Sequence, residues 1–183
     1  FSKDGSIEVF ISSGNWGSKQ YLSTYVCGEG VEFPTVSVPA DTWTHVAFTF
    51  EGNGGSGSDT RKVYLDGVLA DTQTTGTKSV ICSTASLAGV GGRSDSGGSY
   101  SMDGTLDEVG VWDSVLSVTE IAGLHSLTES NYGPQGSFKA GLEGHWRMEE
   151  GTGSTVADLS DNGNTATLVN GASWDAGYFT NGL

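Results

Sequence analysis

The feature that most constrains the fold is a pair of strand-like segments joined by an Asp-Gly dipeptide. Arg61–Leu65 and Val68–Gln73 flank Asp66 and Gly67, the dipeptide that best tolerates the positive φ angles of a type I′ turn. Just before them, the side chains of Thr44–Phe50 alternate strictly between two faces, as in a half-buried strand. These segments predict an antiparallel β-sheet.

The same period-two alternation recurs along the chain, and the composition suits many short strands. Glycine contributes 29 residues and proline only 3, which fits tight turns between strands. A length of 183 residues is enough for one β-sandwich core. The other predicted strands are Ser6–Ile11, Gln20–Val26, Val31–Val38, Ser86–Val90 and Leu106–Trp112.

A short helix is predicted after the last of these strands. Ser117 and Glu120 have the spacing of a capping box, and Leu116 and Ile121 are placed as its hydrophobic staple. The helix is expected to end near His125.

Four segments together carry a resemblance to a known family: Asp41–Phe50, Arg61–Leu69, Gly104–Trp112 and Leu116–Ile121. They resemble the C-terminal two-thirds of a laminin-G-like domain of the concanavalin A-like lectin/glucanase superfamily. The resemblance implies an all-β fold, a concanavalin A-like jelly-roll sandwich of two antiparallel sheets with one short helix.

The tail of the chain resembles the opening strands of the same family, in Gly141–Gly153, Val156–Asn164 and Asn170–Trp174. In an ordinary member these strands come first, so their order is permuted here. The residues that members carry between the two parts have no match in this chain.

The predicted organisation therefore has three parts: residues 1–127, a linker at 128–140 without an apolar period, and residues 141–183. A sheet that lacks its first strands leaves an unpaired edge. We expect the tail to complete a sandwich, either in its own chain by permutation or by donation to the next subunit or repeat.

The charge balance excludes several partners. Lys and Arg number 8 against 22 Asp and Glu, a net charge of -14. Such a surface repels nucleic acid and anionic membranes. No run of apolar residues is long enough to cross a bilayer, so membrane insertion is not expected.

Calcium is the predicted cofactor, with a structural role. Asp158, Asp161, Asn162 and Asn164 cluster oxygen donors in one turn, and Ca²⁺ takes six to eight oxygen ligands. The family resemblance implies a calcium ion between an early loop and a late strand, with Asp107 as the late-strand ligand. The alternative is an Asx-turn whose side chains cap their own backbone.

Aromatic residues in or beside glycine-rich loops are candidates for stacking on sugar rings. Trp16, Tyr21 and Tyr100 are the predicted ligand-binding residues, and Tyr25 is a further candidate. The alternative for Trp16 is a ring folded over the edge of the sheet.

The two cysteines, Cys27 and Cys82, both lie in strand-like segments. A disulfide between them would stabilise the fold by roughly 4 kcal/mol on the loop-entropy model. Two buried free thiols are the alternative.

No enzyme activity is predicted, although glucanases share the superfamily. Those enzymes place two glutamates on one strand face. Here Glu149 and Glu150 are adjacent, as are Asp107 and Glu108, and adjacent strand residues point to opposite faces.

The predicted function is a non-catalytic extracellular recognition or adhesion module, a repeat of a larger cell-surface protein. Its partner would be a glycan or an extracellular protein. One alternative is the structural subunit of an extracellular fibre or array, a homopolymer of copies assembled by β-strand complementation. The other is an accessory domain of a polysaccharide-degrading enzyme.

Overall fold

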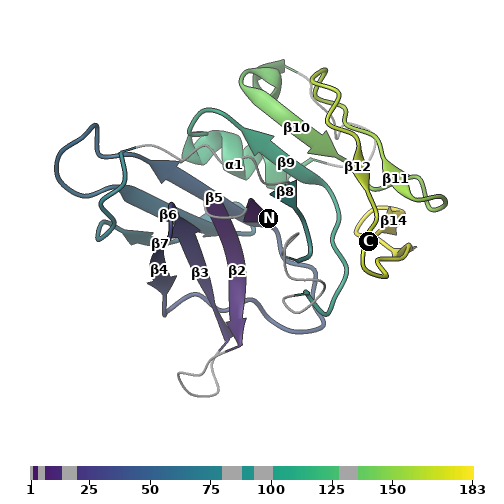
Figure 1. Cartoon of the computed structure of the whole chain (residues 1–183), viewed down its shortest axis with the longest axis horizontal. Coiled ribbons are helices and arrows are strands. Elements are labelled where there is room, and N and C mark those ends of the chain that lie inside the picture. The colour runs from purple at the N-terminus through teal and green to yellow at the C-terminus, as the bar shows by residue number, and fades with distance from the viewer. Residues whose placement is uncertain (1, 4–6, 14–19, 80–87, 93–100, 128–135) are drawn as a thin grey trace. The chain divides into compact units, whose positions relative to one another are not determined.

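The computed structural model divides the chain into two compact units, Phe1–Met102 and Asp103–Leu183 (Figure 1). The residues that the structure describes are 2–3, 7–13, 20–79, 88–92, 101–127 and 136–183.

The first unit is built from β-strands alone in its described residues. The strands are β1 (Ser2–Lys3), β2 (Ile7–Ser13), β3 (Gln20–Val26), β4 (Glu29–Phe33), β5 (Val46–Glu51), β6 (Thr60–Leu65), β7 (Val68–Gln73) and β8 (Ala88–Gly89). They form a larger sheet in the order β4-β3-β2-β1-β8 and a smaller sheet in the order β5-β6-β7 (Figure 1). Every pairing is antiparallel.

The two sheets of the first unit pack against each other through a common core. Leu22 and Phe33 of the larger sheet pack with Val63 of the smaller sheet, and Val9 and Phe48 border them. Full burial of such side chains contributes roughly 1.5–3 kcal/mol each. Packing of two antiparallel sheets confirms the predicted concanavalin A-like β-sandwich.

The predicted hairpin is confirmed by its turn. Asp66 and Gly67 have φ angles of 49° and 76°, and β6 and β7 pair directly on either side of them. The register shifts between Val63 and Tyr64, so that both side chains are buried although they are adjacent in sequence.

A fully buried arginine links three segments of the first unit. Arg61 donates from Nε and Nη2 to the carboxylate of Asp59, at 3.0 Å each, and from Nη2 to Glu29 at 3.2 Å. Asp59 also accepts from the amide of Lys78, and Glu29 from the amide of Thr77. Removing one partner of such a group leaves a buried charge unpaired, which costs roughly 3–5 kcal/mol.

The second unit is centred on the antiparallel pair of β9 (Val109–Trp112) and β10 (Leu142–Trp146) (Figure 1). Two further antiparallel pairs are very short. The remaining elements are α1 (Val118–His125), η1 (Gly136–Lys139), β11 (Thr155–Val156), β12 (Ala166–Thr167), β13 (Asp175–Ala176) and β14 (Asn181–Gly182).

The β9–β10 pair bears on the predicted organisation of the chain. It joins the tail to the segment before the linker within one chain. The two compact units divide between Met102 and Asp103, and the predicted three-part organisation stays a prediction. Donation of the tail to another subunit stays a prediction.

Part of the predicted linker is packed structure. The indole Nε1 of Trp112 donates to the carbonyl of Phe138, in η1, at 2.8 Å. A Cβ atom at Gly123 of α1 would lie 2.9 Å from the Phe138 ring, so the glycine permits this close approach. Residues 136–139 thus pack against β9 and α1, whereas residues 128–135 lie outside the described residues.

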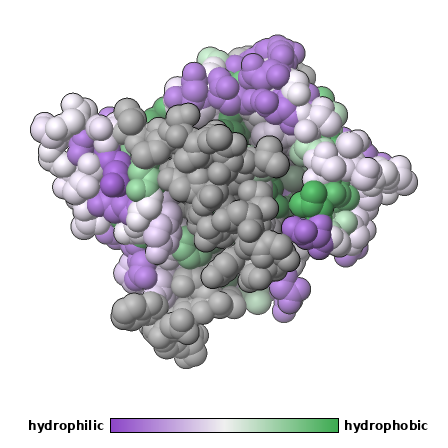
Figure 2. All heavy atoms as spheres, viewed as in Figure 1, coloured by the Kyte–Doolittle hydropathy of each residue, from purple (hydrophilic) through white to green (hydrophobic). Residues whose placement is uncertain are grey.

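The predicted helix is confirmed with its capping box. The hydroxyl of Ser117 accepts from the amide of Glu120, and the Glu120 carboxylate accepts from the amide of Ser117 at 2.7 Å. No described helix is long and apolar enough to span a membrane. Among the residues coloured by hydropathy in Figure 2, hydrophobic ones form small separate patches between hydrophilic ones.

Candidate functional site

The structure describes only part of the predicted ligand-binding and disulfide residues. Tyr21 lies on β3, whereas Trp16 and Tyr100 lie outside the described residues. Cys27 is disulfide-bonded, while Cys82 also lies outside the described residues. Disulfides persist mainly in oxidising compartments.

One face of the larger sheet carries aromatic side chains that point away from the core. The register places Phe10 opposite Ser23, and Tyr25 opposite Gly30, so these residues lie on the side of the sheet away from Leu22. The rings of Phe10 and Tyr25 stack, with centroids 5.7 Å apart and planes at 27°. The two residues are 36% and 42% exposed. We call the surface formed by Phe10, Tyr21, Ser23, Tyr25, Gly30 and Glu32 the outer face.

Gly30 explains where the Tyr25 ring lies. A Cβ atom at Gly30 would come within 2.9 Å of that ring, closer than carbon atoms approach in contact. The ring therefore occupies the space above β4 that a side chain would otherwise fill. A glycine inside a strand weakens it, and an aromatic ring that covers the glycine offsets part of this loss.

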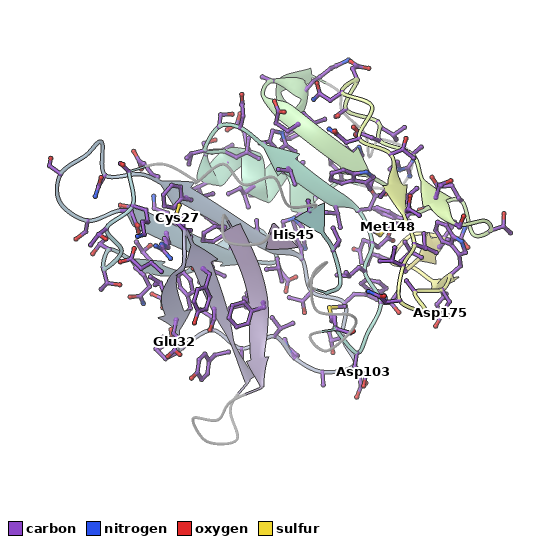
Figure 3. All side chains as sticks on the ribbon, viewed as in Figure 1. Cys27, Glu32, His45, Asp103, Met148 and Asp175 are labelled. Atoms are coloured by element: carbon purple, nitrogen blue, oxygen red, sulfur yellow. The ribbon has the colours of Figure 1, made fainter. Side chains whose placement is uncertain are left out.

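A carboxylate lies on the same face. Glu32, labelled in Figure 3 near several aromatic rings, is exposed and lies opposite Ser23. Burial raises the pKa of Tyr21, and the negative charge of Glu32 and a hydrogen bond to it raise this pKa further. Ser23 is buried, and its hydroxyl has no hydrogen-bond partner among the described residues. The outer face thus combines two stacked rings with a hydrogen-bond acceptor.

A second candidate site, in the second unit, consists of carboxylates. One oxygen each of Asp107, Glu108 and Glu149 lies within 4.8 Å of the others. We call these three residues the acidic cluster. Among the five residues predicted for calcium, Asp107 is the member that the structure brings into this cluster.

The backbone explains why these carboxylates converge. Adjacent strand residues point to opposite faces, but Glu108 has a φ of 53°, so that β9 begins only at Val109 and the alternation is broken before it. Met148 has a φ of 60° just before Glu149. Because β9 and β10 are antiparallel, the start of one lies beside the end of the other. The expectation that Asp107 and Glu108 diverge is therefore wrong.

In Asp107 and Glu149, backbone amides donate to only one of the two carboxylate oxygens. Asp107 Oδ2 accepts from the amides of Tyr178 at 2.7 Å and Phe179 at 3.2 Å. Glu149 Oε2 accepts from the amide of Asn181 at 3.3 Å. The other oxygens, Asp107 Oδ1 and Glu149 Oε1, are buried without a hydrogen-bond partner among the described residues. Unpaired buried carboxylate oxygens are costly, and they are the ligands that a hard cation takes.

The third carboxylate is held by basic groups. The Glu108 side chain is 7% exposed, and its carboxylate oxygens lie 3.1 Å from His145 Nε2 and from Arg147 Nε. Burial raises the pKa of Asp107 to about 6, although amide hydrogen bonds lower it, and the charges of Glu108 and Glu149 add to the rise. Burial, more than neighbouring charge, therefore disfavours the ionised form of Asp107.

A hollow of about 270 Å³ lies beside Glu149, in the same unit. The donor set and its two unpaired oxygens fit a calcium ion. The residues that line the hollow are Arg147, Glu149, Glu150, Ala157 and Leu159.

The turn that the sequence suggested for calcium uses its carboxylate for hydrogen bonds within the protein. Asp158 accepts from the amides of His145, Ser160 and Asn164 at 2.8–2.9 Å, and from the Ser160 hydroxyl at 2.8 Å. Burial alone would raise the pKa of Asp158, but these hydrogen bonds lower it below its ordinary value. This arrangement is that of the Asx-turn alternative.

The other side chains of the turn are also engaged. Asn162 and Asn164 donate through Nδ2 to the carbonyl of Glu143, at 3.2 and 2.9 Å. Asp161 is exposed and forms an ion pair with Lys139. The amides thus bind the turn to β10. A calcium-binding role for these residues stays a prediction.

Sequence reasoning missed candidate residues at both sites. Phe10 could have been found, because it alternates with Val9 and so belongs to the opposite face of the strand. Glu108 and Glu149 gave no such signal. Their convergence depends on positive φ angles at Glu108 and Met148, and residues other than glycine rarely adopt such angles, so the sequence does not indicate them.

Comparison with known proteins agrees with this architecture. Residues 1–122 match the laminin G-like family model of the concanavalin A-like lectin/glucanases superfamily. The fold is similar to the crystal structure of a candidate carbohydrate-binding protein from Bacteroides ovatus, with a TM-score of 0.63 and 16% identity over 92% of this chain and 50% of that one. This chain therefore spans about half the length of that protein. No curated protein matches the chain. Since the family match covers most of its length, the chain belongs to the concanavalin A-like lectin/glucanases superfamily.

Proposed function

We propose that the protein is a non-catalytic carbohydrate-binding module whose binding surface is the outer face. The observation that carries this proposal is the stacked and exposed pair of Phe10 and Tyr25, with Glu32 beside it. Aromatic rings offer flat apolar area that suits the C–H face of a sugar ring. A carboxylate accepts hydrogen bonds from sugar hydroxyls. The candidate carbohydrate-binding protein of similar fold supports the same class of function.

The positions of the carboxylates support binding without bond cleavage. Glycoside hydrolysis requires two carboxyl groups that flank the scissile bond. Glu32 is the one carboxylate among the described side chains of the outer face, although the register also places the backbone of Glu8 opposite Tyr25. In the acidic cluster, the unpaired oxygens of Asp107 and Glu149 are buried, where a glycosidic oxygen cannot reach them.

The proposal includes a structural calcium ion held by Asp107, Glu108 and Glu149. Its support is the pair of buried, unpaired carboxylate oxygens in a cluster of three acidic residues. The amides of Tyr178 and Phe179, between β13 and β14, donate to Asp107 beside the β9–β10 pair. An ion there would neutralise part of the negative charge at this point. Calcium would then stabilise the second unit rather than contact the ligand.

The proposed location of the module is outside the cell, in a larger surface protein. The disulfide of Cys27 supports an oxidising compartment. The fibre alternative requires a free tail, and in the described part of the chain β10 already pairs with β9 of the same chain. Recognition of a glycan is therefore preferred to self-assembly.

The test of the proposed function is binding of the wild-type chain to a glycan microarray and to immobilised polysaccharides. Tyr25→Ala should weaken binding by about 2 kcal/mol, roughly thirtyfold, as expected for an aromatic residue at the centre of an interface. Tyr178→Ala is the matched control, because Tyr178 is 54% exposed but lies in the second unit. Absence of glycan binding, or equal losses in both variants, would refute the proposal.

A further inference from the structure

The outer face carries one charge among its described side chains, and this charge is negative. Glu32 lies opposite Ser23 on the strand next to the Phe10–Tyr25 stack. Phe10, Tyr21, Ser23 and Tyr25 are uncharged at neutral pH. We propose that the outer face selects uncharged glycans and rejects glycans that carry carboxylate or sulfate groups. This inference rests on the proposed function, since it concerns the same surface.

The hydrogen-bonding capacity of Glu32 explains the selection. An ionised carboxylate has about four acceptor sites and no donor. The Tyr21 hydroxyl uses one of these sites, and the exposed position of Glu32 leaves the others open to a ligand. Sugar hydroxyls can donate to them. A carboxylate or sulfate on the ligand has no proton to donate at neutral pH, so it would place two acceptors of like charge against each other.

The repulsion at this face is local as well as global. The whole chain has a net charge of -14, which disfavours every anionic ligand at long range. Salt screens charges over a Debye length of about 8 Å at physiological ionic strength. A charge in contact with the ligand, such as that of Glu32, therefore acts strongly, whereas distant carboxylates act only weakly.

This difference between local and global charge gives a controlled experiment. Glu32→Gln removes one charge from the outer face but keeps an acceptor for Tyr21. Glu51→Gln removes one charge from an exposed residue at the end of β5, in the smaller sheet, and changes the net charge equally. Both are surface substitutions, and thermal unfolding checks that each variant is folded.

The probes are pairs of polymers that share a backbone and differ in charge: methyl-esterified and de-esterified homogalacturonan, cellulose and carboxymethyl cellulose, and dextran and dextran sulfate. Affinities are measured at about 0.15 M salt. For each backbone that binds, the wild type should prefer the uncharged member at least tenfold. Glu32→Gln should reduce this preference severalfold, and Glu51→Gln should leave it within twofold.

The outcomes of the polymer-binding experiment separate the inference from the proposed function. The expected pattern supports the inference. An anionic member bound as tightly as its uncharged counterpart, or equal shifts in the two variants, overturns the selection while the proposed function stands. If the wild type binds no polymer of the panel and no glycan of the microarray, the proposed function fails and the inference fails with it.

Discussion

Two aspartates of the second unit show how differently one residue type can be used. Asp158 accepts hydrogen bonds from three backbone amides and a hydroxyl, and its pKa is lowered. Asp107 accepts from two amides through one oxygen, keeps its other oxygen buried without a partner among the described residues, and has a pKa raised to about 6. The comparison teaches that hydrogen-bond satisfaction, not the number of nearby oxygens, separates a structural turn from a candidate cation site.

The largest expected effect comes from removing the satisfied carboxylate. Asp158→Ala should lower the free energy of unfolding by about 3 kcal/mol, because three amides would lose a charged acceptor. Chemical denaturation measures this change. The loss should be the same in calcium and in chelator, since Asp158 is assigned to the turn.

Asp161→Ala is the control for this prediction. Asp161 belongs to the same turn, but its side chain is 73% exposed and its ion pair with Lys139 lies at the surface. Such pairs contribute about 0–1 kcal/mol. If Asp158→Ala cost no more than Asp161→Ala, or removed a stabilisation by calcium, the assignment of Asp158 to the turn would be wrong.

The second effect concerns the cation itself. Calcium at a hundredfold excess over its dissociation constant should stabilise the folded chain by about 2.7 kcal/mol. Asp107→Asn and Glu149→Gln should each remove most of this gain, because each replaces a carboxylate ligand by a neutral amide. Thermal unfolding with and without calcium measures it. If the melting temperature of the wild type is the same with calcium and with chelator, the assignment of Asp107 to a cation site is wrong.

The smallest effect is a dependence of stability on pH without calcium. Because the folded pKa of Asp107 is about 6, above its unfolded value of about 3.9, its ionised form destabilises the folded state. This cost is complete above pH 6, falls as the pH decreases, and vanishes below about pH 4. In chelator at pH 7.5, Asp107→Asn should therefore be more stable than the wild type by about 1 kcal/mol, allowing for screening by water. The two proteins should converge near pH 4, and a difference that does not depend on pH would contradict the raised pKa.

Much of the fold could be predicted because its signals are local. The Asp66–Gly67 turn and the capping box of Ser117 and Glu120 depend on residues within a few positions of each other, and both are present in the structure. The site was harder to predict. The sequence identified Tyr21 and Tyr25 as candidates, but the stacking of Tyr25 on Phe10 and its placement over Gly30 depend on the register of three strands.

The sequence by itself determined the class of fold, the turns and the helix, since alternation, turn residues and caps act between neighbours in the chain. Only the tertiary structure decided which carboxylates meet. Asp107 and Glu149 are far apart in sequence and come together because β9 and β10 are antiparallel and the backbone adopts positive φ angles at Glu108 and Met148. Asp158, in contrast, lies among amides that satisfy it. Whether a carboxylate is left short of partners depends on every segment that packs around it, and residue spacing alone does not carry that information.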